Sequence, residues 1–186
     1  MRIVAGTFRG RTLASVGKGD MGAHLRPTTD RVRESLFNVL TQTGAIPQAR
    51  VLDLFAGTGA LGLEALSRGA SHVTFVETGR VAMDLIRKNI ALTGSAGQTG
   101  LSRRDAVRLG PNPEAPYDLV FLDPPYGKGM GEKALALAAQ GDWIAPRALI
   151  VWEENAPMPA PAGFLLRDRR KYGDTHVTIL EWTEPV

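Results

Sequence analysis

The stretch Val51-Leu52-Asp53-Leu54-Phe55-Ala56-Gly57-Thr58-Gly59-Ala60-Leu61-Gly62 decides the fold of this chain. Its apolar start predicts a buried strand, its glycines predict a tight turn, and an apolar helix follows until Gly69 stops it. A strand, a glycine turn and a helix in this order open a βαβ unit, whose helix N-terminus favours an anionic group. The stretch therefore predicts an α/β fold with a ligand bound at this turn.

Predicted strands and helices alternate through most of the chain, which is the pattern of a doubly wound parallel sheet. We expect strands near 50–54, 72–77, 100–104, 117–122 and 147–153, and helices near 60–68, 79–93 and 132–140. The tail differs, because Phe164–Arg170 and His176–Trp182 have the pattern of two strands joined by Tyr172-Gly173-Asp174. It predicts an antiparallel hairpin at the sheet edge, in place of the parallel sixth strand with which nicotinamide-binding domains usually end.

The first 40 residues form a small extension in this interpretation. Residues 2–14 alternate enough to form a hairpin around Gly6 or Gly10, and a glycine-rich loop follows at 17–22. A helix then begins with Thr28 or Thr29 as its N-cap. Its apolar face carries Val32, Leu36, Val39 and Leu40, and its polar face carries Arg31, Glu34 and Asn38. We expect a single domain over 1–186, with the extension at 1–40 and the ligand-binding core at 41–186.

Asp53 indicates which kind of cofactor the turn binds. Gly57, Gly59 and Gly62 satisfy the GxGxxG pattern of dinucleotide sites, and Glu77 follows on the next strand, where an acid can hold ribose hydroxyls. Asp53, however, lies where a dinucleotide would place its pyrophosphate, and a carboxylate repels phosphate at short range. It suits a cofactor with a cationic group, such as the ammonium of S-adenosylmethionine. On these residues alone, a nicotinamide enzyme stays an open alternative.

The turn Asp123-Pro124-Pro125-Tyr126 has the parts needed to hold an amine. The carboxylate of Asp123 and the carbonyl of Pro124 can both accept hydrogen bonds from one NH2 group, and the prolines keep the turn stiff. Tyr126 offers a flat face on which a base can stack. A base must be unpaired or flipped out of its helix to enter such a site. The turn therefore predicts chemistry on an exocyclic amine or a planar amide.

Four acidic residues lie at the ends of successive predicted strands, namely Asp53, Glu77, Asp105 and Asp123. The carboxyl ends of parallel strands meet at one edge of the sheet, so we expect these side chains to line one site. In this interpretation Asp53 orients the methionine ammonium and Glu77 holds the ribose hydroxyls. Asp105 accepts a hydrogen bond from the adenine amino group, and Asp123 holds the amine that is methylated.

These motifs together resemble the S-adenosylmethionine-dependent methyltransferases that modify exocyclic amines. The resemblance narrows to the RsmD family, bacterial 16S rRNA guanine-N2 methyltransferases, through several further segments. They are Arg9-Gly10-Arg11, LRPTTDRVRE at 25–34, Phe37-Asn38 and LGLEALSRGA at 61–70. The similar region runs from about Arg2 to Thr183. It implies the Rossmann-like fold of class I methyltransferases for nearly the whole chain, with S-adenosylmethionine as the cofactor.

The resemblance also implies roles for individual residues. The expected catalytic residues are Asp123, Pro124 and Tyr126. The expected cofactor-binding residues are Asp53, Phe55, Gly57, Gly59, Glu77, Asp105 and Ala106. The expected RNA-binding residues are Arg9, Arg11, Arg26, Thr28, Arg31, Arg33 and Lys171. The substrate would be 16S rRNA, either naked or assembled in the small-subunit particle, and no metal is expected.

The distribution of charge favours a polyanionic partner. The net charge is only +3, yet residues 1–33 hold six Arg and one Lys against two Asp. A second basic cluster follows near the C-terminus, at 167–171. Clustered cations on a folded domain are typical of nucleic-acid binding. Arg also outnumbers Lys 17 to 5, which a GC-rich genome would produce without any function.

The composition excludes several classes of site. The chain has no cysteine, which excludes disulfides, thiolate metal sites and the cysteine nucleophile that methylation of pyrimidine C5 usually needs. The three histidines, His24, His72 and His176, lack the spacing of metal ligands. No segment resembles a signal peptide, and no run approaches the ~18 apolar residues of a membrane span. We therefore expect a cytoplasmic, monomeric protein that does not contact membranes.

Four other functions stay open at this point. A DNA adenine-N6 methyltransferase uses the same turn, but it usually carries a separate target-recognition region. A protein glutamine methyltransferase would more often have Asn in place of Asp123. A nicotinamide oxidoreductase would not need the Asp123–Tyr126 turn, and a non-catalytic RNA-binding module would need neither this turn nor the glycine turn.

Overall fold

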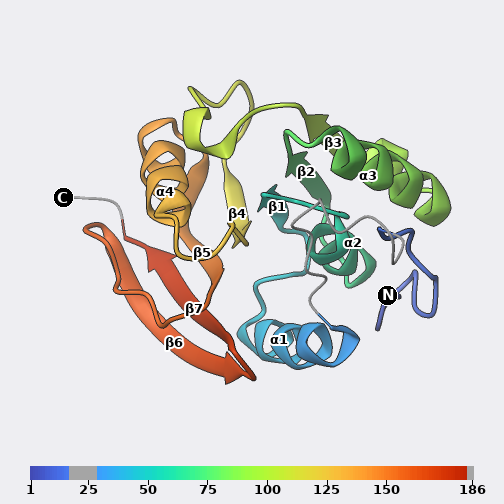
Figure 1. Cartoon of the computed structure of the whole chain (residues 1–186), viewed down its shortest axis with the longest axis horizontal. Helices are drawn as coiled ribbons and strands as arrows, with labels where there is room; N and C mark the ends of the chain where they lie inside the picture. Colours follow the sequence, from blue (N-terminus) through green and yellow to red (C-terminus); the bar gives the residue numbers. More distant parts are fainter. Residues whose placement is uncertain (17–28, 184–186) are drawn as a thin grey trace.

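A computed structural model describes residues 1–16 and 29–183, which form one seven-stranded sheet with helices on both faces (Figure 1). The strands are β1 (Arg50–Leu54), β2 (His72–Val76), β3 (Thr99–Ser102), β4 (Tyr117–Leu122), β5 (Ile144–Glu154), β6 (Phe164–Tyr172) and β7 (Thr175–Trp182). The α-helices are α1 (Asp30–Thr43), α2 (Ala60–Ser67), α3 (Arg80–Thr93) and α4 (Met130–Gln140). Short 3-10 turns η1 (Ala96–Gln98) and η2 (Ala106–Arg108) flank β3.

The order of the strands places a binding site at the middle of the sheet. It is β3-β2-β1-β4-β5-β7-β6, with β1 to β5 parallel and β7 antiparallel to both β5 and β6. The chain therefore winds outward in one direction from β1 and in the other from β4. Ligands of open α/β sheets bind where the order reverses, at the carboxyl ends of the strands. The end of β1 leads into the glycine turn, and the end of β4 leads into Asp123.

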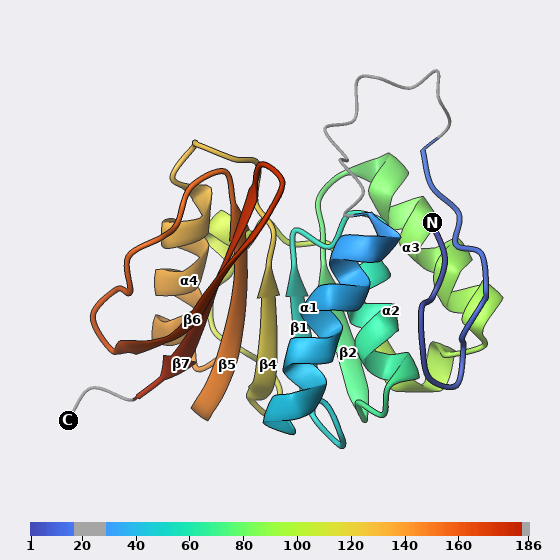
Figure 2. The same cartoon turned by 90° about the horizontal axis from the view of Figure 1, so that it is seen from below.

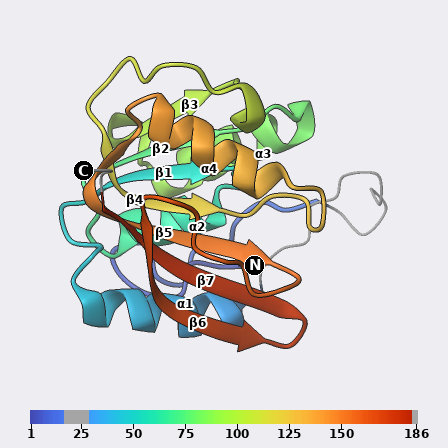
Figure 3. The same ribbon diagram turned by 90° about the vertical axis from the view of Figure 1, so that its left-hand side faces the viewer.

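Two hydrophobic cores fill the space on either side of the sheet. The first packs α1, α2 and α3 against one face and includes Leu36, Phe37, Leu63 and Ile86. The second packs α4 against the other face and includes Leu135. Figure 3 shows α1 and α4 on opposite sides of the strands. Because β1 and β4 are covered on both faces, they are apolar along most of their length, as is typical of parallel strands.

The N-terminal segment, residues 1–16, packs on the helical layer and runs along α2 and α3 (Figure 2). Its two arms pair through a single bridge, Arg2 to Thr12, so the predicted hairpin forms without regular strands. The amides of Ile3 and Gly10 bond across the arms, whereas other amides of the segment bond to α2. Val4 and Ala5 donate to the Glu64 carboxylate, and Ile3 joins the first core. The extension and the catalytic part therefore share one hydrophobic core.

The helix and strand predictions agree with the structure to within a few residues. Thr29 is the N-cap of α1 and accepts a hydrogen bond from the amide of Val32. The predicted polar face of α1 is exposed, and the predicted hairpin at the sheet edge is β6–β7. β5 begins earlier than expected, at Ile144, and β3 ends earlier, at Ser102. The predicted glycine-rich loop at 17–22 and His24 lie outside the described residues.

Candidate active site

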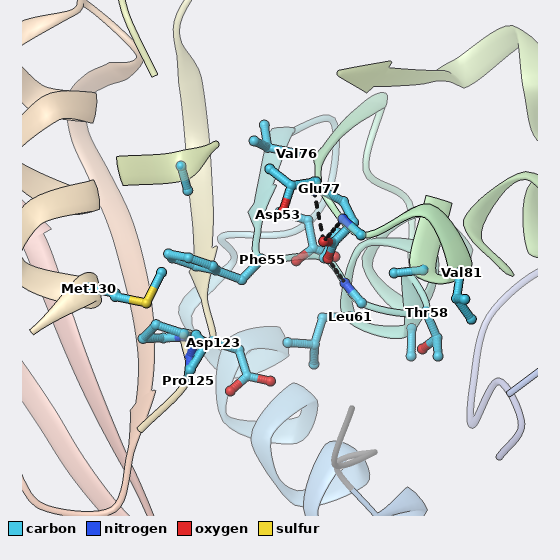
Figure 4. Close-up of a pocket in the computed structure, with 18 of the residues that line it drawn as sticks. Asp53, Phe55, Thr58, Leu61, Val76, Glu77, Val81, Asp123, Pro125 and Met130 are labelled. Atoms are coloured by element: carbon cyan, nitrogen blue, oxygen red, sulfur yellow. Dashed lines mark hydrogen bonds between the residues drawn. The ribbon is translucent and has the colours of Figure 1, made fainter. Parts of the chain in front are cut away.

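A pocket of about 1030 Å³ opens at the carboxyl ends of β1, β2 and β4. It brings together most of the residues predicted to bind the cofactor or the target amine, namely Asp53, Phe55, Gly57, Glu77, Asp105, Ala106, Asp123, Pro124 and Tyr126. Pockets for small ligands usually measure ~300–1,000 Å³, so this one has room for a cofactor and a base together. Figure 4 shows Asp53 and Glu77 on one part of the wall and Asp123 with Pro125 on another.

The glycine turn bends the chain tightly between β1 and α2. Gly57 and Gly59 have φ angles of 58° and 77°, in the left-handed region that glycine tolerates. Phe55 has a φ of 60°, which is uncommon for a bulky residue and marks a conformation held by its surroundings. Gly59 is the N-cap of α2 and does not line the pocket, so it shapes the turn without forming part of the wall.

Asp53 is buried and supports the helix that follows the turn. The amide of Gly62, in the first turn of α2, donates to its Oδ2 at 3.0 Å, and no side chain caps this helix. Burial raises the pKa of Asp53 to about 8; the Gly62 hydrogen bond opposes the rise, and Glu77 and Glu153 add to it. Without a cation beside it, this group therefore favours its proton at neutral pH. A cationic ligand beside it would favour the carboxylate.

Glu77 anchors the loop between β2 and α3 as well as the glycine turn. Its Oε2 accepts from the amide of Gly57 at 2.9 Å. Its Oε1 accepts from the amides of Thr78 and Gly79, both at 2.8 Å. A carboxylate has about four acceptor positions, so at least one position is left for a ribose hydroxyl. Glu77 thus joins the two loops that a nucleoside would touch.

Asp105 and Ala106 form the part of the wall that follows β3. Asp105 is the N-cap of η2, where its Oδ1 accepts from the amide of Val107 at 3.0 Å. Its second oxygen is available for an amino group, as the sequence predicted for adenine. Ala106 is buried in the second core and also lines the pocket, so its small side chain leaves space for a flat ring.

Asp123 lies at the end of β4 among other acidic groups. Burial raises its pKa well above the usual range, and the charges of Glu153, Asp53 and Glu154 raise it further. Glu153 and Glu154 end the neighbouring strand β5, and both are buried. Glu154 also accepts from the amides of Gly127 and Asn155, at 3.0 and 2.8 Å, and so fixes the loop that follows Tyr126.

Tyr126 offers a ring that stays neutral at physiological pH. Partial burial raises the pKa of its phenol to about 12, with Asp123 and Glu153 adding to the rise and a hydrogen bond with Thr175 opposing it. The residue lines the same pocket as Asp123 and Pro124. A neutral ring is suited to stacking on a base, and a pKa this high argues against a role as a general base.

The residues predicted to bind RNA lie in three places: outside the described residues, on the exposed surface and, for Arg33, in the core. Arg26 and Thr28 lie outside the described residues. Arg9, Arg11, Arg31 and Lys171 are exposed, none lines the pocket, and Arg11 donates to the carbonyl of Leu92 near the end of α3.

Arg33 corrects the sequence prediction, because its side chain is completely buried and cannot reach RNA. Its guanidinium contacts Asp30 at 2.9 Å and Glu64 at 3.7 Å, and it donates to the carbonyl of Arg2. Glu64 in turn pairs with Arg68 at 2.8 Å. Arg33 therefore belongs to an ion-pair network that joins α1, α2 and the N-terminal segment.

Sequence reasoning missed several residues around the pocket. Met1, Ser15 and Val16 line it, although they are distant in sequence from both motifs. Glu153 and Glu154 were detectable, since two acidic residues end a predicted apolar strand just as Asp53 and Asp123 do. Among the residues the structure describes, no group of His, Asp or Glu side chains is arranged to hold a metal ion.

Comparison with known proteins identifies the family. The profile of a family described as Conserved hypothetical protein 95 matches residues 1–181. Ribosomal RNA small subunit methyltransferase D of Escherichia coli K12 is 40% identical over 176 residues, which cover 93% of this chain and 85% of the relative. The protein of the same name from Haemophilus influenzae is 37% identical over 178 residues, covering 93% and 89%. The chain belongs to the RsmD family.

Solved structures agree with this assignment. A putative methyltransferase from Escherichia coli, yhhF, superposes with a TM-score of 0.82 at 37% identity, covering 98% of both chains. An RNA methyltransferase from Salinibacter ruber, solved with S-adenosyl-L-homocysteine, has a TM-score of 0.65 at 15% identity, which supports the fold alone. The sequence prediction of the RsmD family and of the class I methyltransferase fold is confirmed.

Proposed function

We propose that this protein transfers a methyl group from S-adenosylmethionine to the exocyclic N2 amine of a guanine in 16S rRNA. The observation that carries the proposal is the pocket in which the glycine turn and the Asp123–Tyr126 turn face each other across the switch point of the sheet. Membership of the RsmD family supports rRNA methylation. The choice of guanine N2 rests on the family resemblance and is the part that most needs a test.

The residues of the pocket fit S-adenosylmethionine. Asp53 is a buried carboxylate at the turn, suited to a cationic ammonium and unsuited to a pyrophosphate. Glu77 would hold the ribose, and Asp105 and Ala106 would hold the adenine. The close approach of β2 to α2 leaves no room for a larger residue at Gly62, whose added Cβ would lie 2.5 Å from the Phe75 ring. The cofactor, when bound, supplies an electrophilic methyl group on a sulfonium.

Asp123 and the Pro124 carbonyl would orient the target amine. Guanine N2 is a weak nucleophile because its lone pair is delocalised into the ring. Two acceptors on its hydrogens would pull the nitrogen toward tetrahedral geometry and stabilise the positive charge that develops there. Asp123 or water would accept the surplus proton of the methylated nitrogen, and the electron pair of the broken S–C bond would remain with the sulfur of the cofactor. Tyr126 would stack on the base and hold it in line.

Exposed cations near α1 and the β6–β7 hairpin support contact with RNA phosphates. Arg31 and Lys171 are exposed on these two elements, and the hydroxyl of Ser35 on α1 donates to that of Tyr172 at 3.3 Å. The helix and the hairpin therefore meet, and a hydrogen bond between Tyr126 and Thr175 joins the hairpin to the turn that begins at Asp123. Among the described residues no helix has the length and apolar character needed to cross a bilayer.

The proposal is tested by identifying the methylated nucleoside. The protein is incubated with S-adenosylmethionine labelled in the methyl group and with unmodified small-subunit particles, naked 16S rRNA or DNA. The nucleic acid is then digested and the labelled nucleoside identified. We expect N2-methylguanosine from rRNA or particles, and the better acceptor identifies the natural substrate. Label in N6-methyladenine, or in none of the acceptors, would overturn the assignment.

The proposed role of Asp123 has its own test. We expect Asp123→Ala to bind S-adenosylmethionine with near wild-type affinity and to lose about 10²–10³ in kcat, because it removes a group that acts on the developing charge. Calorimetry measures the binding and single-turnover methylation measures the rate. Wild-type turnover by the variant would exclude this mechanism.

A further inference from the structure

The cofactor pocket is completed by a part of the chain that the motifs do not predict. Ser15 and Val16 lie on its wall together with the glycine turn. The N-terminal segment reaches this position from α2, where Val4, Ala5 and Phe8 donate to the side chains of Glu64 and Ser67. Those contacts hold only the beginning of the segment. A different contact must hold the other end of the segment, which lines the pocket.

Asn89 on α3 makes that contact. Its side chain is fully buried, and its Oδ1 accepts from the amide of Ala14 at 2.7 Å. Its Nδ2 donates to the carbonyl of Ala14 at 3.0 Å and to the carbonyl of Thr58 at 2.9 Å. Thr58 is in the glycine turn, between Gly57 and Gly59. One side chain thus ties the turn to the segment that closes over it.

The chemistry of these three bonds requires an amide. Both hydrogens of the side-chain NH2 and one lone pair of its oxygen are used, and only Asn or Gln offers two N–H donors together with a carbonyl acceptor. Aspartate would set a carboxylate against two backbone carbonyls, and alanine would leave three partly buried backbone groups without this partner. Buried polar groups left in this state are costly, so the turn and the segment would separate.

We infer that Asn89 is a positioning residue for the cofactor, which holds the Thr58 turn and the Ala14–Val16 segment together so that both contact S-adenosylmethionine. The inference rests on the proposed use of this cofactor. It assigns to Asn89 an effect on cofactor affinity and none on the methyl-transfer step, since the residue is absent from the pocket wall. It also makes the N-terminal segment a part of the cofactor site.

The test compares Asn89→Ala with Thr93→Ala, a matched control one turn further along α3. The hydroxyl of Thr93 is also buried and bonds to the carbonyls of Asn89 and Ile90 and to Ser95, so its loss weakens the helix without touching the turn. Calorimetry gives the Kd for S-adenosylmethionine at a temperature where circular dichroism shows both variants folded. Single-turnover methylation at saturating cofactor gives the rate of the chemical step.

We expect Asn89→Ala to raise the Kd about tenfold, as the loss of two or three hydrogen bonds predicts, with the rate at saturation within about twofold of wild type. Thr93→Ala should leave the Kd within about twofold of wild type. Ala14→Pro removes the backbone donor to Asn89 and leaves the Asn89 side chain in place. It should also raise the Kd, which covers the case in which Asn89→Ala does not fold.

Equal Kd values for the wild type and the Asn89 and Ala14 variants would overturn the inference, and so would an equal rise in the Thr93 control. Failure of the wild-type protein to bind S-adenosylmethionine would instead contradict the proposed function itself.

Discussion

Burial and cofactor binding have opposite effects on the pKa of Asp53. Burial raises this pKa to about 8, whereas an ammonium bound beside the group would favour the carboxylate. Between about pH 4, the usual pKa of an aspartate, and pH 8, the native state binds more protons than the unfolded state. The free energy of unfolding contributed by this group is therefore fully present below pH 4. It is lost as the pH rises to 8.

We predict that Asp53→Asn raises the melting temperature of the cofactor-free protein at pH 8, with a smaller difference at pH 5. Asparagine keeps an oxygen for the Gly62 amide and removes the carboxylate that must ionise in a buried position. The same change should weaken binding of S-adenosylmethionine. Thermal unfolding at several pH values measures the first effect and calorimetry the second. If the melting temperatures of Asp53→Asn and the wild type depended on pH in the same way, Asp53 would be ionised in the cofactor-free protein.

If Asp123 has the proposed role, its ionisation should make the rate of methylation depend on pH. Because it must accept hydrogen bonds and stabilise a developing positive charge, we predict that kcat/KM for rRNA, at saturating cofactor, rises with pH as Asp123 ionises. Glu153 is the strongest of the nearby charges that raise its pKa. Glu153→Gln should therefore move the rising limb of the profile to lower pH.

Glu114→Gln is the control for this prediction, since Glu114 is exposed and pairs with Arg50, away from the pocket. It should leave the profile in place. If the limb stayed at the same pH in Glu153→Gln as well, a group other than Asp123 would control the rate.

At the scale of the element, α2 depends on close contact with β2. A Cβ added at Gly62 would lie 2.5 Å from Phe75 and 2.6 Å from Val73, both in the strand. We predict that Gly62→Ala destabilises the protein by ~1–3 kcal/mol, the usual cost of overpacking a core. It should also weaken cofactor binding, because α2 begins directly after the glycine turn. Gly97→Ala is the control, since it meets open space and should change stability by less than ~0.5 kcal/mol. Chemical denaturation measures both.

The elements themselves were predictable because each depends on local patterns. Strands such as β1 and β4 are apolar runs, and α1 begins at a threonine cap, so their bounds agree with the structure to within a few residues. Residues at the ends of strands were predictable for the same reason, since the topology brings those ends to one edge. The contact of the N-terminal arms with α2 was not predictable, because their amides bond to the side chains of Glu64 and Ser67, some 60 positions away.

Arg33 illustrates a pattern that was present in the sequence and interpreted wrongly. It shares the helical spacing i, i+3, i+4, i+7 with Leu36, Phe37 and Leu40, all of which are buried. That spacing places it on the core face of α1, although its charge suggested RNA contact. What the sequence could not supply was its partner, because the carboxylate of Glu64 is on another helix. A buried charge becomes predictable only when both members of the pair are placed.

At the scale of the whole molecule, the Arg33–Glu64 pair joins three parts of the fold. It connects α1 to α2, and through Glu64 it reaches the amides of Val4 and Ala5. Both side chains are completely buried. Removal of Arg33 leaves the buried Glu64 with Arg68 as its remaining cationic partner. Breaking a buried pair typically costs ~3–5 kcal/mol, and Arg68 should offset part of that cost. The N-terminal segment, whose far end lines the cofactor pocket, should loosen together with the pair.

We predict that Arg33→Met lowers the free energy of unfolding by roughly 3 kcal/mol and weakens binding of S-adenosylmethionine, while Arg33→Met combined with Glu64→Gln recovers part of the stability. Arg87→Met is the matched control, because Arg87 pairs with Asp84 at 2.8 Å on the exposed face of α3. Exposed pairs contribute at most ~1 kcal/mol, so this variant should stay close to wild type in stability and in cofactor binding. Denaturation on the three variants and the wild type measures the stability, and calorimetry measures the binding of S-adenosylmethionine. Equal losses in Arg33→Met and Arg87→Met would mean that the buried pair is not what holds the N-terminal segment to the catalytic core.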